Sequence, residues 1–140
     1  MRKISSLLLG ILVLAPACGL KGDPRPAELV RPKSVVDLGG EITKEGAIRL
    51  HWSRPDASVD GQRLDDLGGF LVFRGTPGTL AEEIAQVPVL DRERFKRQKT
   101  YEYLDKTVSK GNSYYYRIVA HTTDEYYSAP SNQVSVTLEQ

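Results

Sequence analysis

From residue 34 to the C-terminus, apolar residues recur with the two-residue period of β-strands. Ile48, Leu50 and Trp52 alternate with Arg49 and His51, so this segment has one apolar and one polar face. Six further segments are rich in apolar, β-branched or aromatic residues: 35–38, 69–74, 80–90, 100–104, 113–122 and 132–138. Glycine, proline and asparagine separate these segments. The pattern predicts an all-β fold, a seven-stranded β-sandwich.

One of these segments, 80–90, fits two structures. Glu82, Glu83 and Ala85 favour a helix, whereas Ile84 and Val87 favour an edge strand. Both interpretations stay open from the sequence.

The N-terminus has a different pattern. A basic start at Arg2 and Lys3 precedes an apolar run at 7–14, too short to span a bilayer, which takes about 20 residues. Small residues then lead to Cys18, the single cysteine of the chain. We expect 1–17 to be a signal peptide.

The residues around Cys18 resemble a bacterial lipobox, although Ala15 stands where leucine is preferred. The resemblance implies that the Cys18 sulfur carries diacylglycerol and its amine an acyl chain such as palmitate, so that Cys18 anchors the protein to a membrane. Gly19, rather than aspartate, follows the cysteine, which by resemblance to lipoprotein sorting rules implies the outer membrane, on its periplasmic or surface side. Ordinary signal-peptidase cleavage after Ala17 remains the alternative.

Residues 18–33 form the predicted tether, because Pro24, Pro26 and Pro32 favour extended backbone and no apolar period is present. Residues 34–140 then form a single domain. The formal charge is +1 for the whole chain, and loss of Arg2 and Lys3 with the signal peptide brings it to about −1. This balance argues against a nucleic-acid partner, which needs a strong basic excess.

The second half carries a more specific pattern, Tyr103-x-Asp105 followed by Gly111-x-x-Tyr114-x-Tyr116-x-Ile118-x-Ala120. With Trp52 and the 69–74 segment, it resembles the fibronectin type III domain of bacterial exported proteins. The resemblance covers about residues 32–138 and implies a Greek-key sandwich. It also implies that Tyr114 is the tyrosine corner of that fold. Trp52, Tyr114, Tyr116 and Ile118 are therefore the predicted core.

Function is expected on the opposite face of the same strands. If the core residues point inward, alternation turns their neighbours outward on one sheet, and the predicted partner-binding residues there are Leu71, Phe73, Tyr115, Arg117 and Val119. The alternatives are that 80–90 folds over this patch or that these residues are simply good strand formers. Tyr126 and Tyr127, on a polar loop, are a second candidate for stacking on a sugar or protein, or they pack on the rim of the sandwich.

No pattern points to catalysis. His51 and His121 are the two histidines, both in outward strand positions, and no acidic cluster has metal-ligand spacing. We expect no metal, no cofactor and no enzymatic activity. The sequence favours a membrane-anchored module that binds an envelope protein. The alternative is an accessory lipoprotein that binds carbohydrate or cell wall.

Overall fold

The computed structural model describes residues 24–90 and 97–140. The predicted signal peptide 1–17, the predicted lipidation site Cys18 and tether residues 19–23 lie outside the described residues.

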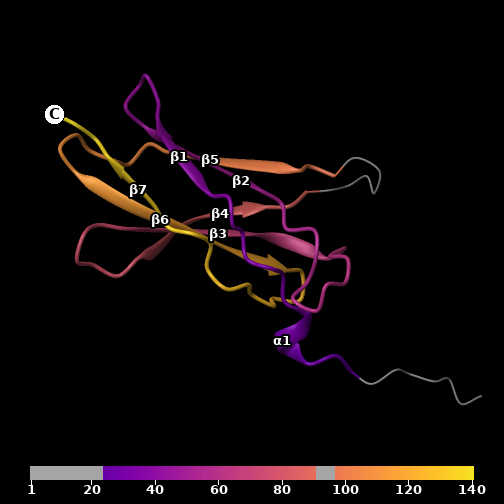
Figure 1. Ribbon diagram of the computed structural model, residues 1–140. Coiled ribbons are helices and arrows are strands. Elements are labelled where there is room, and N and C mark those ends of the chain that lie inside the picture. The colour runs from indigo at the N-terminus through magenta and orange to yellow at the C-terminus, as the bar shows by residue number, and fades with distance from the viewer. Residues whose placement is uncertain (1–23, 91–96) are drawn as a thin grey trace, which may run out of the picture.

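The described chain forms two antiparallel sheets packed face to face (Figure 1). The first sheet has the order β1-β2-β5 and consists of β1 (Gly39–Ile42), β2 (Ile48–Ser53) and β5 (Thr100–Asp105). The second has the order β4-β3-β6-β7 and consists of β4 (Glu82–Pro88), β3 (Leu67–Gly75), β6 (Ser113–Thr122) and β7 (Val134–Thr137). The predicted all-β, seven-stranded sandwich is confirmed.

The core fills the space between the sheets. Burial alternates strictly along β2 and closely along β6, as the sequence period requires. The predicted core residues Trp52, Tyr114, Tyr116 and Ile118 are all buried. The Trp52 ring meets Phe70 edge-on at 5.3 Å between centroids, and Phe70 lies 4.8 Å from Tyr101. Aromatic contacts therefore join β2 and β5 to β3 across the sandwich.

The prediction of a first strand at 35–38 is wrong, because pairing begins only at Gly39, opposite His51. In the segment before Gly39, hydrogen bonds that involve side chains replace the backbone hydrogen bonds of a strand. The Leu38 amide donates to Asn132 Oδ1 at 3.0 Å, and Asn132 Nδ2 donates to the Leu38 carbonyl at 2.9 Å. Asp37 accepts a bond from the Ser53 amide. The apolar pattern was nevertheless informative, since Val35 and Leu38 are both buried.

The open choice for 80–90 is decided in favour of a strand. Glu82–Pro88 is β4, which pairs with β3 alone and forms one edge of the four-stranded sheet.

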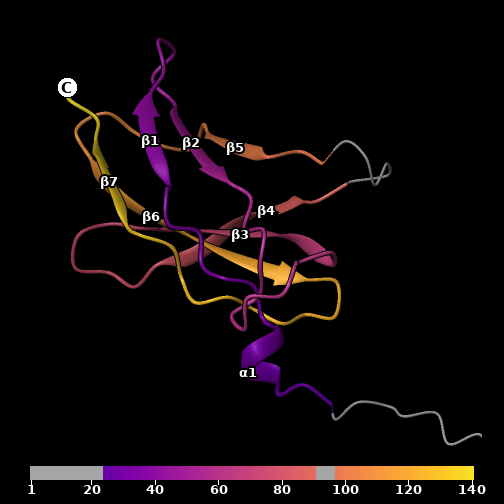
Figure 2. The same cartoon turned by 45° about the vertical axis from the view of Figure 1, so that its right-hand side comes forward.

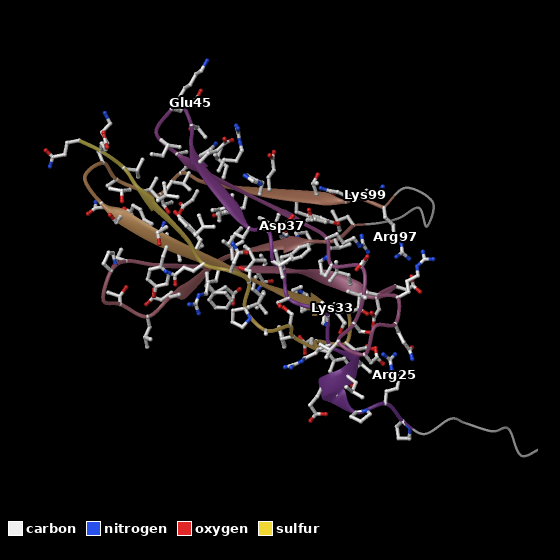
Figure 3. The ribbon with its side chains drawn as sticks, viewed as in Figure 1. Arg25, Lys33, Asp37, Glu45, Arg97 and Lys99 are labelled. Carbon is white, nitrogen blue, oxygen red and sulfur yellow. The ribbon has the colours of Figure 1, made fainter. Side chains whose placement is uncertain are left out.

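The described part of the tether is not an extended spacer. It contains one helical turn, α1 (Ala27–Val30), and lies against the loop after β2 (Figure 2). The Val59 amide donates to the Arg31 carbonyl at 3.0 Å, and Pro32 is bridged to Ser58. Arg25 donates to Asp60 and forms an ion pair with it. Figure 3 shows Arg25 beside this loop at the α1 end of the molecule.

Candidate functional site

The predicted partner-binding residues share the outer face of the four-stranded sheet. Leu71 is in register with Val119, and Phe73 with Arg117, on the adjacent strands β3 and β6. Leu71, Phe73, Tyr115 and Val119 are half-buried, whereas Arg117 is exposed. We call these five residues the outer patch.

Strand β4 borders the outer patch and does not cover it. It adds to the side of β3, with Gln86 opposite Leu71 and Glu83 opposite Phe73. Gln86 Nε2 donates to Glu83 Oε1 at 2.7 Å, which gives this border a polar rim. On the far side, Arg117 donates to Gln133 at 3.1 Å. The patch is therefore an apolar surface with polar groups on both sides.

Two aromatic residues of β6 lie over glycines of β3. A Cβ atom at Gly75 would stand 2.3 Å from the Tyr115 ring, and one at Gly69 would stand 2.9 Å from the His121 ring. Because glycine has no side chain, each ring packs directly on the backbone of its glycine partner. Such pairs favour one register between the two strands. The Tyr115 hydroxyl also donates to the Thr79 carbonyl, so Tyr115 is held at both ends.

Tyr126 and Tyr127 are exposed on the loop after β6 but do not form one platform. Tyr127 lies 5.7 Å from the His121 ring, measured between centroids, and so extends the outer face of the sheet. Tyr126 instead lines a small hollow with Arg25, Arg63 and Asp124 near α1. The loop itself is closed by Thr122, whose hydroxyl accepts from the Tyr126 amide at 3.1 Å.

A polar cluster lies between the two sheets, and the sequence analysis did not predict it. The buried carboxylate of Asp105 accepts bonds from Arg74 and the Tyr116 hydroxyl, each at 2.8 Å, and from the amide and hydroxyl of Thr107. Arg74 also lies over the Tyr114 ring, 5.4 Å from its centroid. The alternation of inward and outward residues could have indicated this cluster. Asp105 lies on the same strand face as Tyr101, and Arg74 on the same face as Val72.

The contacts within this cluster shift the pKa values of its members, Asp105 and Tyr116 among them. Burial by itself would raise the pKa of Asp105, but the bonds from Arg74, Thr107 and Tyr116 outweigh it and hold the pKa below its ordinary value. Burial, together with the neighbouring Asp105 carboxylate, raises the pKa of Tyr116 far above its usual range. The cluster joins β5 of one sheet to β3 and β6 of the other. We assign it a structural role because its groups are saturated by one another.

The tyrosine corner has the geometry that the resemblance implies. The Tyr114 hydroxyl accepts a bond from the Ser109 amide at 3.0 Å, five residues upstream. Between them, Gly111 has φ +79°, a conformation that glycine adopts without steric cost.

In the ranges 24–90 and 97–140, no group of three or more His, Cys, Asp or Glu side chains could hold a metal ion. In the same ranges, no helix has the length and hydropathy to cross a membrane.

Comparison with solved structures identifies the architecture. A fibronectin type III-like protein from Clostridium thermocellum superimposes with a TM-score of 0.55 at 17% identity, over 78% of this chain and 95% of that one. The fold is that of a fibronectin type III domain.

Domains of this fold from larger proteins agree. The FN1–FN3 region of chicken CNTN1 gives a TM-score of 0.57 at 12% identity, over 78% of this chain and 33% of that one. The twitchin kinase region of C. elegans gives 0.57 at 17% identity, over 79% of this chain and 17% of that one. This chain thus spans a third or less of either structure. No protein-family model matches the sequence, and a search of curated proteins gives no match either. At these identities the likeness describes the fold, and function has to be argued from the surface.

Proposed function

We propose that this protein is a lipid-anchored envelope module without catalytic activity, and that it binds a protein partner through the outer patch. One observation carries the choice of surface. The outer patch is an apolar area on a sheet face, and β4 lies beside it as a bordering strand and not over it. An apolar surface with a polar rim is typical of protein interfaces.

Anchoring rests on the sequence around Cys18 and gives the module an orientation. Because Arg25 is bonded to Asp60, seven residues, 18–24, separate the bonded segment from the rest of the chain at Cys18, and seven residues span about 25 Å at most. In this proposal the α1 end of the domain therefore faces the membrane. An outer-membrane location follows from Gly19 in this proposal.

Metabolic labelling tests the anchor. Cells expressing the wild-type chain or Cys18→Ser are grown with an alkyne fatty acid, and the label on the purified protein is measured. We expect label and membrane association in the wild type and neither in the variant. Equal release of both proteins into the soluble fraction, without label, would overturn the anchored part of the proposal.

A pair of matched substitutions tests the surface. Phe73→Asp places a charge in the outer patch, whereas Leu104→Asp places one on the outer face of the three-stranded sheet, where Leu104 pairs with Arg49. We expect proteins that co-purify with the wild type to be lost with Phe73→Asp and retained with Leu104→Asp. Loss with both or with neither variant would remove the case for the outer patch.

A further inference from the structure

A groove lies at the end of the outer face that is farthest from α1. It has a volume of about 420 Å³, and its walls are the turn after β3 and the ends of β6 and β7. Pro77 lies on the turn, Tyr115 and Ser113 on β6, and Ser135 and Thr137 on β7. We call this the distal groove. Figure 1 shows the C-terminus at this same end of the molecule.

The chemistry of the distal groove is uncharged and rich in hydroxyl groups. Among the described residues that line it, none is acidic or basic. Ser113 and Thr137 share a hydrogen bond of 2.8 Å between their hydroxyls, so each keeps further donor or acceptor capacity for a ligand. Gln133 accepts from Arg117 through its carbonyl oxygen, which fixes the orientation of its amide group at the edge of the groove.

Tyr115 supplies a rigid aromatic surface in the groove. Its ring rests on Gly75 and its hydroxyl is bonded to Thr79, so a ligand that stacks on it loses little side-chain entropy. Tyr126 and Tyr127 do not form an equal arrangement, because Tyr126 lies among charged neighbours and Tyr127 packs near the His121 ring.

We propose that the distal groove binds a neutral glycan chain. A fixed aromatic ring matches the apolar face of a pyranose, and surrounding hydroxyl and amide groups match its hydroxyls. An anionic or cationic ligand would find no opposite charge among the lining residues. The volume of about 420 Å³ lies within the range of about 300–1,000 Å³ that is typical of ligand pockets.

The orientation of the distal groove in the cell rests on the proposed lipid anchor. With α1 towards the membrane, the distal groove points away from it, towards any polysaccharide layer that the membrane faces. Tyr115 belongs to both the outer patch and the distal groove, so each test uses a residue of one site alone, Phe73 for the outer patch and Ser135 for the groove. Glycan binding itself needs neither the lipid nor the protein partner, and failure of one proposal is therefore distinguishable from failure of the other.

Titration calorimetry tests the glycan proposal on the full exported protein, purified in a detergent without sugar headgroups. The probes are chitohexaose and cellohexaose. Ser135→Lys places a cation in the groove at an exposed β7 position, and Thr100→Lys is the matched control at an exposed β5 position. We expect at least one probe to bind saturably, at least tenfold more weakly to Ser135→Lys and equally to Thr100→Lys.

Three outcomes would overturn the proposal. They are no saturable heat from either probe at millimolar concentration, equal binding by Ser135→Lys, and binding that is lost instead with Tyr126→Ala. Circular dichroism of each variant distinguishes lost binding from lost folding. If Ser135→Lys does not fold, Ser135→Gln replaces it with the same expected direction.

Discussion

Four hydrogen bonds converge on the carboxylate of Asp105. It is fully buried, and its partners come from two strands, β3 and β6, and from the loop after β5. A buried carboxylate stabilises a fold only when its partners compensate for lost hydration. Here four donors provide that compensation, and one of them is the Arg74 cation.

Replacing this carboxylate tests its role. Asp105→Asn leaves Arg74 without its counter-charge and disturbs the hydroxyl of Tyr116, so we expect a loss of about 3 kcal/mol in the free energy of unfolding. Urea denaturation monitored by Trp52 fluorescence measures it. Asp65→Asn, which alters an exposed ion pair with Arg97, is the control and should lose much less. Equal stability of Asp105→Asn and the wild type would show that the cluster contributes nothing.

The lowered pKa of Asp105 also predicts how stability depends on pH. Because folding favours the ionised form, the contribution is fully present above the unfolded pKa of about 4. It is lost as the pH falls through the lower folded value. The free energy of unfolding should therefore decline more steeply below about pH 4 in the wild type than in Asp105→Asn. Parallel curves for the two proteins would contradict this assignment.

At the scale of single elements, the sequence predicted which side chains of a strand point inward. It did not predict which segments pair with one another. The burial pattern agrees with the alternation in 48–52, 69–74 and 113–122, and Leu71 and Val119 share one face as that alternation predicts. The segment 35–38 was assigned wrongly because its backbone is bonded to the Asn132 side chain, a partner 94 residues away. Short-range patterns carry no information on such a contact.

The two candidate sites differ in the same way in how far the sequence predicts them. The outer patch followed from parity alone, whereas the distal groove depends on the turn after β3 lying beside β7. That proximity arises from the sheet order β4-β3-β6-β7. The separation of Tyr126 from Tyr127 likewise depends on where α1 and its neighbouring loop lie.

Strand β4 is an exposed edge, and its sequence protects it. Glu82, Glu83 and Pro88 are exposed there, and charges and proline oppose pairing with a second chain. We expect the triple variant Glu82→Val/Glu83→Val/Pro88→Val to self-associate with increasing concentration, as measured by sedimentation velocity. Lys106→Val/Lys110→Val, in the exposed loop after β5, is the control. A triple variant that sediments as the wild type does would refute this protective role.

At the scale of the whole molecule, the clamp between Arg25 and Asp60 fixes the N-terminal segment to the domain. Asp60→Ala removes the ion pair and the acceptor for Ser58, so α1 should detach more often. Exposed Glu28 then becomes a better substrate for a glutamate-specific protease. Mass spectrometry of the digest should show faster cleavage after Glu28 in Asp60→Ala than in the wild type or in Asp124→Ala. An unchanged rate would mean that the clamp does not hold the segment.

The central claim is that this fibronectin type III fold presents the outer patch to a protein partner beside a membrane. Site-specific photo-crosslinking in intact cells tests it most directly, with the photoreactive residue at Phe73 or, on the other sheet, at Leu104. The account predicts a discrete crosslinked species from position 73 that is absent from position 104 and disappears when Val119→Asp is added. The same species from both positions, or a species from position 104 alone, would contradict it.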